Sequence, residues 1–459
     1  MACAPEAGAP STPVTGPVTA QTPEPEPHEV DGDEQLARAA VQSTLQEVTR
    51  VRGLAPLRPV RTRVVGRDEL VTSVRARMDK DVPREVVEGT ERLLLALGVV
   101  PIGFDYRASL LTLLGSQLAG VYDPDAEVML LAADLAEDEL RATLAHELVH
   151  ALQDQHYDLG SRLEYREGEA DSQSALHALA EGDATSAMAD QMLAGRGMTA
   201  LDLSDAQLFD NLRSSIENAD GTQAVPLVIK QAVIAPYIDG IALVHWARRR
   251  GGWGEVNRLW GDPPVSTEQL LHPDKLLSAE APEDVAVPVA DRAGMRLTYQ
   301  DVMGELSLRL VFEQWMETSA AQRAAAAWAG DRVAVFRDGE RHGVVWHVRY
   351  DDAAAARRGL LGFGAGVVMA ADQERETSEQ AAVGSGAASR RRVDAAAAFR
   401  AVESGQACQS RNRRGPLAVV LRGRDVVLVA GPHVGSPPRE AAGDCASAVA
   451  WAEQVAGQG

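Results

Sequence analysis

Residues 146–156 read HELVHALQDQH, and three of the chain's ten histidines fall within these eleven positions. Residues four apart on a helix lie one above the other, with their Cβ atoms about 6 Å apart. His146 and His150 have this spacing, so both imidazoles can bind one metal ion, as histidines do in zinc sites. Glu147 would then stand beside the metal, where a carboxylate can take a proton from an activated water molecule. The spacing predicts a metal centre with His146 and His150 as ligands and Glu147 as catalytic base.

The flanks of this stretch predict that it is helical. No Pro or Gly interrupts the sequence from residue 137 until Gly160, and leucines recur every four residues. These leucines, on the side opposite the two histidines, are Leu140, Leu144, Leu148 and Leu152. An apolar stripe of this kind anchors a helix in a core, so we expect the histidines to face a cleft.

A catalytic zinc ion usually takes three protein ligands and leaves its fourth position to water. We favour Glu181 as the third ligand, because a helical run over residues 168–193 can deliver it to the histidines without strain. His156 competes, since it lies ten residues after His146 as in the pattern HExxHxxGxxH. Gln153 replaces the glycine of that pattern, however, and a turn with positive φ is costly for any other residue. The remaining candidates are Glu169, Asp171 and His177.

Residues 146–154 resemble the metal helix of thermolysin-type gluzincins, and their extension to Leu159 is similar to uncharacterised bacterial and archaeal surface proteins. The likeness spans roughly residues 100–350 and includes the segment ALAEGDA, residues 178–184, and stretches around Tyr237, His272 and Arg332. The resemblance implies a zincin fold and zinc, with His146, His150 and Glu181 as ligands and Glu147 as base. It also implies hydrolysis of peptide bonds. The gap between His150 and Glu181 is longer than in thermolysin.

The expected fold class is α+β, with three regions along the chain. Residues 1–33 are rich in Pro, Ala, Thr and Glu and read as a disordered tether. Residues 34–282 are expected to form a zincin-like domain with a helical N-terminal subdomain, a small sheet, the HExxH helix and a second ligand helix. Residues 283–459 are expected to form a smaller α+β domain.

Three local expectations bear on the site. Residues 120–125 and 127–132 read as a hairpin whose edge can hold an extended peptide, with a cleft beside residues 128–132. The apolar stretch 224–247 contains Lys230 and Asp239 and reads as two buried helical pieces broken at Pro236, not as a membrane span. Residues 371–392 read as a surface loop.

Further side chains are candidates for supporting roles. Cleavage of a peptide bond needs a donor for the developing oxyanion, and Tyr237 and His272 are candidates because each stands next to a proline. Asp154 and Asp183 are candidates for orienting an imidazole from outside the ligand set.

Charge and cysteines give expectations about partners and location. The net charge of −21, from 66 acidic and 45 basic residues, excludes nucleic acid as a main partner. Cys3 follows two residues and precedes the tether, as at the acylated end of a bacterial lipoprotein, and we expect membrane attachment only through such an anchor. Cys408 and Cys445 can pair in an oxidising compartment. We therefore expect a polypeptide-cutting zinc enzyme outside the cytoplasm; the alternative is a non-catalytic surface binding protein that keeps a zincin fold.

Overall fold

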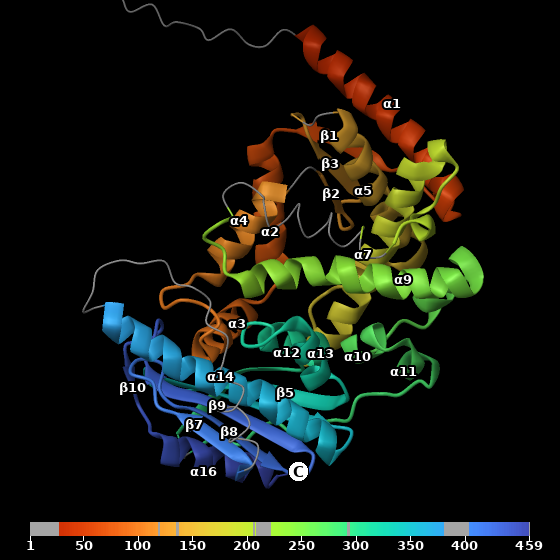
Figure 1. The fold of residues 1–459 in the computed structure, drawn as a ribbon. Coiled ribbons are helices and arrows are strands. Elements are labelled where there is room, and N and C mark those ends of the chain that lie inside the picture. The colour runs from red at the N-terminus through yellow and green to blue at the C-terminus, as the bar shows by residue number, and fades with distance from the viewer. Residues whose placement is uncertain are drawn as a thin grey trace, which may run out of the picture.

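The computed structural model describes residues 27–117, 120–134, 137–204, 207, 222–291, 294–380 and 404–458. Two sheets and many helices build a mixed α+β structure, which confirms the expected fold class (Figure 1). A three-stranded sheet lies in the N-terminal half of the chain, and a seven-stranded sheet forms the C-terminal half.

The N-terminal half is mainly helical, and the small sheet packs beside the candidate metal helix α5. Its helices are α1 (Pro27–Arg52), α2 (Arg67–Asp81), α3 (Arg84–Leu97), α4 (Tyr106–Gln117), α5 (Glu137–Tyr157), α6 (Leu159–Arg162), α7 (Ala170–Leu193), α9 (Leu227–Gly261), α10 (Thr267–Leu271) and α11 (Pro273–Leu277), with 3-10 turns η1 (Ala194–Arg196) and η2 (Ala200–Asp202). Its strands are β1 (Arg61–Val65), β2 (Gly120–Asp123) and β3 (Val128–Ala132).

The expected hairpin is present, but the edge of the sheet differs from the expectation. The strand order is β1-β3-β2, with β3 parallel to β1 and antiparallel to β2. Residues 128–132 therefore form the central strand, because β1 from earlier in the chain pairs with their outer side. The strand that remains at an edge beside α5 is β2.

Helices α7 and α9 cross unusually closely at two glycines. A Cβ atom at Gly182 would overlap the backbone of Gly240, and one at Gly240 would overlap the carbonyl oxygen of Ala178. Only glycine, which has no side chain, allows two helices to approach this closely. The close contact at these glycines fixes the positions of the residues next to them on α7 and α9.

The expected break of the apolar stretch at Pro236 is wrong. Helix α9 runs through this proline, and its backbone leaves helical geometry only at Gly251 and Gly252. A proline inside a helix costs about 3 kcal/mol, but Ile234 and Ile241 on either side are buried, and each buried side chain of this size contributes about 1.5–3 kcal/mol. The kink occurs instead where Gly252 has a φ of 62°.

Helix α9 is the one helix in the described part of the chain that is long and apolar enough to cross a membrane. It packs against α4, α7, α10 and α12 in the middle of the molecule, between the two sheets (Figure 1). Its apolar character is therefore accounted for by its place in the core.

The C-terminal half is an antiparallel sheet with helices on both faces. Its strands are β4 (Arg296–Asp301), β5 (Trp328–Asp338), β6 (Arg341–Tyr350), β7 (Gln406–Gln409), β8 (Leu417–Arg422), β9 (Asp425–Val434) and β10 (Glu440–Ala441), and its helices are α12 (Gly304–Phe312), α13 (Thr318–Ala325), α14 (Ala353–Gln380) and α16 (Cys445–Ala456). The order is β4-β5-β6-β9-β8-β7, with β10 paired to β9. Figure 1 shows α14 over one face and α16 over the other.

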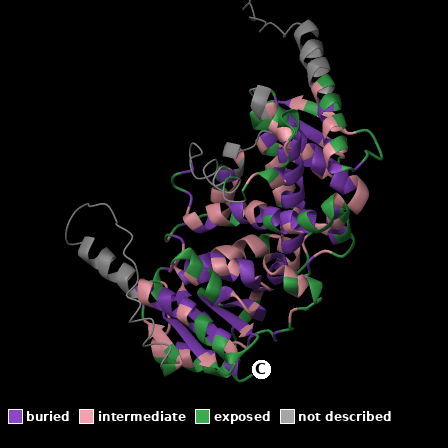
Figure 2. Ribbon diagram, turned by 45° about the vertical axis from the view of Figure 1, so that its right-hand side comes forward, coloured by how far each residue is buried: buried purple, intermediate pink, exposed green. Residues whose placement is uncertain are grey.

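The boundary expected at residue 283 does not separate two independent cores. Leu93, Ala96 and Leu97 of α3 belong to the same buried cluster as Trp346 of β6. Arg411, near the end of the chain, donates to the carbonyl oxygen of Ala96 at 2.7 Å. In Figure 2 the buried residues continue from the sheet into the helices above it. The halves therefore share a core through α3.

Three further expectations can be compared with the structure. Helix α1 begins at Pro27, seven residues before the expected start of the folded region, and residues 1–26 lie outside the described residues. The expected loop 371–392 is helical as far as Gln380, because α14 continues through it; residues 381–392 are not described. Cys408 and Cys445 form a disulfide, as expected.

Candidate metal centre

Helix α5 presents both histidines of the HExxH segment on one side. Leu144, Leu148 and Leu152 on its other side are fully buried. Leu148 packs with Met129 of β3, and Leu152 packs with Ala184 of α7. This packing fixes the rotation of α5 about its axis and hence the direction of the imidazoles.

The third expected ligand comes from α7. The Nε2 atoms of His146 and His150 lie 3.0 Å apart. Oε2 of Glu181 is 3.1 Å from Nε2 of His146 and 3.5 Å from Nε2 of His150. The structure thus brings together all three of the favoured ligands.

These separations fit a zinc ion. Zinc–nitrogen and zinc–oxygen bonds of about 2.0–2.2 Å in a tetrahedron place the ligand atoms about 3.3–3.6 Å apart. The three separations of 3.0, 3.1 and 3.5 Å lie close to this range. Two imidazole nitrogens and one carboxylate oxygen are also donors that zinc prefers.

Without a metal, the same three side chains form an ion pair. Burial disfavours the charged imidazolium, but the negative charge of Glu181 and its hydrogen bond outweigh burial and raise the pKa of His150 to about 9. Burial would raise the pKa of Glu181, yet the charge of His150 and the hydrogen bonds from both imidazoles hold that pKa well below its usual range. The cluster therefore binds a positive charge strongly, and metal ions compete with protons at such sites.

The other carboxylate oxygen of Glu181 has a separate partner. Nε2 of His177, one turn earlier on α7, lies 3.0 Å from Oε1 of Glu181. His177 was an alternative ligand, but its side chain is 47% exposed and lies on the far side of the carboxylate. Its contact leaves Oε2 directed at the two histidines of α5.

Glu147 is held by the neighbouring sheet edge. Its Oε2 accepts a hydrogen bond from the backbone N–H of Tyr122 in β2 at 2.8 Å. The charge of Glu147 also contributes to the raised pKa of His150, which places the carboxylate near the ligand cluster. Glu147, which follows His146 directly on α5, is thus tied to the edge strand β2 by its side chain.

Tyr237 on α9 also reaches the cluster. Its ring stacks on the imidazole of His146 with centroids 6.0 Å apart. Burial, together with the charges of Glu181 and Glu147, holds the pKa of Tyr237 well above its usual range. The phenol therefore keeps its proton at neutral pH and can act as a hydrogen-bond donor.

A residue that sequence reasoning did not assign to the site orients His150. Oε1 of Gln153 lies 2.8 Å from Nδ1 of His150, and Nε2 of Gln153 donates to the carbonyl oxygen of Ala180 at 3.0 Å. The available sequence signal was the spacing of three residues from His150, which puts Gln153 on the same side of the helix.

The two carboxylates expected to orient an imidazole are engaged elsewhere. Asp154 accepts from the Tyr122 hydroxyl at 3.0 Å and from the backbone N–H of Gly160. Asp183 forms a fully buried ion pair with Arg52 and accepts from the Trp260 indole. The expectation for both is wrong, because each carboxylate accepts its hydrogen bonds from groups other than an imidazole of the cluster.

Two further candidates lie away from the three ligand atoms. Nε2 of His156 is 2.7 Å from the carbonyl oxygen of Ala55, so its imidazole packs against the segment after α1. His272 is hydrogen-bonded to Glu305 of α12 at 2.8 Å, which ties its imidazole to the C-terminal half. Among the described residues, neither His156 nor His272 is hydrogen-bonded to the three ligand side chains.

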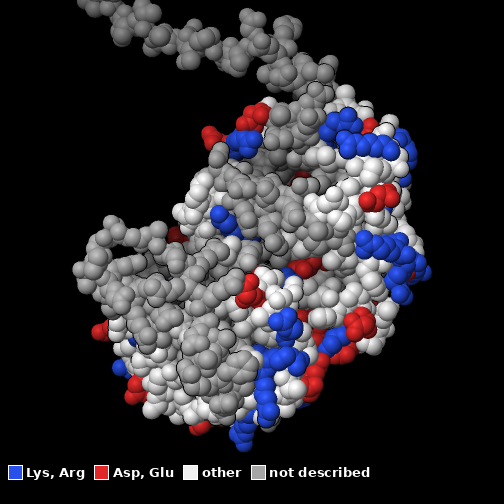
Figure 3. Space-filling view, in the orientation of Figure 1, with Lys and Arg blue, Asp and Glu red and all other residues white. Residues whose placement is uncertain are grey.

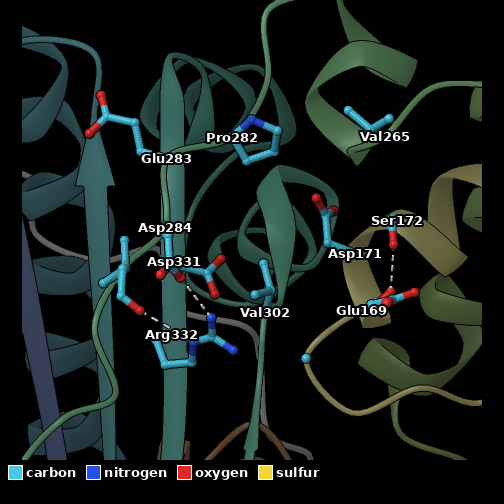
Figure 4. Close-up of a pocket in the computed structure, with 12 residues that line it drawn as sticks. Glu169, Asp171, Ser172, Val265, Pro282, Glu283, Asp284, Val302, Asp331 and Arg332 are labelled. Carbon is cyan, nitrogen blue, oxygen red and sulfur yellow. Dashed lines mark hydrogen bonds and ion pairs between the residues drawn. The ribbon is translucent and has the colours of Figure 1, made fainter.

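Glu169 and Asp171, the last two alternative ligands, line a separate cavity between the two halves. This cavity has a volume of about 280 Å³ and is bordered from the C-terminal half by Asp331 and Arg332 (Figure 4). Burial raises the pKa of Asp171 to about 7 although Thr267 donates two hydrogen bonds to it. Asp171 is thus part of the junction between the halves and not of the metal centre.

A second cluster of carboxylates, Glu268, Glu280 and Asp351, has the spacing of a metal site. The ammonium group of Lys275 lies at its centre, 2.6, 2.7 and 2.8 Å from the three carboxylates. The centre of this cluster is therefore occupied by an ammonium group of the chain itself. On the face drawn in Figure 3, basic and acidic side chains lie next to one another in several places.

Comparison with known proteins adds one match, which concerns the C-terminal half. A family profile described as a domain of unknown function, DUF8575, matches residues 295–439. No curated protein and no solved structure matches the chain. The matched residues run from just before β4 to just before β10, so the profile covers the large sheet except β10 and excludes α5 and α7.

Proposed function

We propose that the chain is a zinc-dependent peptidase of zincin type that cuts polypeptides. One observation carries the proposal: α5 and α7 deliver three zinc-type ligand atoms to one point, with Glu147 beside them. The ligand group formed by the described residues has three members. Catalytic zinc sites have three protein ligands, whereas structural sites usually have four.

In the proposed mechanism His146, His150 and Glu181 hold the ion. Zinc bound there would supply Lewis acidity, which acidifies a water molecule and polarises a carbonyl group. Glu147 takes a proton from the attacking water, whose oxygen bonds to the carbonyl carbon of the peptide, and gives this proton to the amine nitrogen as the C–N bond breaks. The Tyr122 N–H keeps one Glu147 oxygen in place during both transfers. The Tyr237 hydroxyl donates to the oxygen that becomes negative, where removal of one such donor typically costs about 10²–10³-fold in rate.

A polypeptide is the substrate class that fits the surroundings of Glu147. Strand β2 is the edge of its sheet and contacts Glu147 through Tyr122. An extended peptide can add to such an edge by backbone hydrogen bonds.

We also propose that the protein works outside the cytoplasm, held by a lipid at Cys3. The bond between Cys408 and Cys445 supports export, because disulfides persist in oxidising compartments. Cys3 lies outside the described residues.

The deciding experiment compares wild type with Glu147→Gln. Purified proteins are loaded with zinc, their metal content is measured, and cleavage of a denatured polypeptide mixture is followed by mass spectrometry. Glu147 is not a ligand, so zinc content should stay equal while the cleavage rate falls by about 10²–10⁴-fold, the usual contribution of a general base. The matched control is Glu164→Gln, because the Glu164 side chain is exposed.

The outcomes separate the proposal from its alternative. Equal cleavage by wild type and Glu147→Gln would refute the peptidase mechanism. Stoichiometric zinc without cleavage by wild type would favour a non-catalytic binding protein, and a wild type that takes up no zinc would remove the metal centre itself.

A further inference from the structure

Gln153 lies fully buried between the two helices that carry the candidate ligands. It stands on α5, one turn after His150, and reaches across to the residue that precedes Glu181 on α7. Both ends of its carboxamide are used, at 2.8 Å to Nδ1 of His150 and 3.0 Å to the carbonyl oxygen of Ala180.

The partners of this amide fix its orientation. A backbone carbonyl can only accept a hydrogen bond, so the NH2 group of Gln153 must face Ala180. The carbonyl oxygen of Gln153 then faces His150 and can only accept, which requires a proton on Nδ1. In the neutral imidazole the lone pair is therefore on Nε2, the atom that faces His146 and Glu181.

We propose that Gln153 is a positioning residue that selects the metal-binding tautomer of His150 and sets the distance between the two ligand helices. Both effects act through the planar carboxamide of Gln153. Its oxygen orients the ligand His150 on α5, and its nitrogen binds the backbone of α7 next to the ligand Glu181. The proposal rests on the proposed zinc site. Gln153 stands where the pattern HExxHxxGxxH has a glycine; the chain continues as a helix here, and the side chain makes two hydrogen bonds that a glycine could not make.

The test replaces Gln153 with methionine, which keeps the length and loses both hydrogen bonds. The matched control is Gln155→Met on the same helix, because Gln155 also bonds to backbone groups, those of Leu57 and Arg58, but away from the centre. Zinc affinity is measured by competition with a chromophoric chelator. Loss of a partner that orients a metal ligand typically costs about 10–100-fold in affinity, so Gln153→Met should bind zinc about 10–100-fold more weakly and Gln155→Met should match wild type.

A second readout separates positioning from packing. In zinc-loaded protein labelled with ¹⁵N-histidine, His150 should show a protonated Nδ1 whose hydrogen exchanges slowly with solvent. That hydrogen should exchange quickly in Gln153→Met and slowly in Gln155→Met. Gln153→Glu, which keeps an acceptor for Nδ1–H, should restore slow exchange.

The possible results distinguish a failure of the inference about Gln153 from a failure of the proposed zinc site. If wild type binds zinc and Gln153→Met binds it within twofold, or if the Nδ1 hydrogen exchanges at the same rate in both, the inference about Gln153 is wrong while the zinc site stands. If wild type binds no zinc, the inference fails together with the proposed function. A drop in affinity with fast Nδ1–H exchange supports it.

Discussion

Glu181 shows how the two oxygens of one carboxylate can serve different partners. Its Oε2 faces His146 and His150, and its Oε1 faces His177. A carboxylate oriented in this way offers a metal one oxygen with a fixed direction, and such support usually strengthens metal binding.

Replacement of Glu181 with alanine should therefore abolish stoichiometric zinc binding. Removing one of three ligands leaves two imidazoles, fewer than a catalytic zinc site requires. Metal content after gel filtration is the measurement, and His156→Ala is the control, because that imidazole bonds to Ala55. If His156→Ala loses zinc and Glu181→Ala keeps it, the third ligand is His156 and not Glu181.

At the residue scale the sequence predicts the local part of the site. His146, Glu147 and His150 follow from a four-residue spacing on one helix. The role of Gln153 could not be predicted, because it depends on a carbonyl of α7 that only tertiary packing brings near. Asp183 was misassigned for the same reason, since its partner Arg52 lies 131 residues away.

At the scale of elements, the crossing of α7 and α9 positions the centre. Gly182 follows Glu181 directly, and Gly240 lies one turn after Tyr237. The close approach of these two glycines therefore sets the distance between the third ligand and the tyrosine. A side chain at either position would push the helices apart.

Gly240→Ala should accordingly destabilise the protein and weaken the centre. Inserting atoms into a packed interface costs about 1–3 kcal/mol, and sometimes more where backbone is hit. The control is Gly254→Ala on the same helix, where a Cβ would meet nothing within 4 Å; removing a helical glycine there should stabilise by about 0.5–1 kcal/mol. Denaturant midpoints of the two variants should move in opposite directions, and a Gly240→Ala midpoint equal to wild type would contradict the packing argument.

Most helices and strands could be predicted from the sequence, but the ends of the helices and the pairing of the strands could not. The leucine period predicts α5, and residues 120–132 were expected to form the hairpin that is β2 and β3 in the structure. The break at Pro236 was predicted from local chemistry, and burial along α9 overrides it. The pairing of β1 with β3 joins segments more than sixty residues apart, for which a local pattern carries no signal.

For the whole molecule, the junction of the halves holds buried carboxyl groups that come from both halves. Asp171 from α7 and Asp331 from β5 are 2% and 1% exposed. Burial raises the pKa of Asp331 to about 6, although Met303, Gly304 and Trp328 all donate to it. Asp171 faces Thr267, and the charges of Asp331 and Glu305 raise its pKa further.

The junction should therefore become less stable as pH rises. The pKa of Asp171 increases from 3.8 to about 7 on folding, so its stabilising contribution is complete below pH 4 and is lost as pH rises through 7. At about 1.4 kcal/mol per pKa unit the full effect is about 4 kcal/mol. Asp171→Asn should reduce the fall of the thermal midpoint between pH 5.5 and 8.

The control for this measurement is Asp284→Asn, because Asp284 lines the same cavity and its side chain is 89% exposed. Its thermal midpoint should follow wild type at every pH. A pH dependence that is the same in wild type and Asp171→Asn would show that this carboxyl does not titrate with folding.

The placement of α3 has a consequence for synthesis on the ribosome. Leu93, Ala96 and Leu97 are translated early, yet the apolar surface that covers them includes Trp346 and Leu428, which emerge some 250 or more residues later. A nascent chain that has completed α5, α7 and α9 still carries this exposed helix. The core around α3 can therefore close only after the last strands of the large sheet have left the exit tunnel, and until then the incomplete chain exposes an apolar helix to aggregation and to cellular proteases.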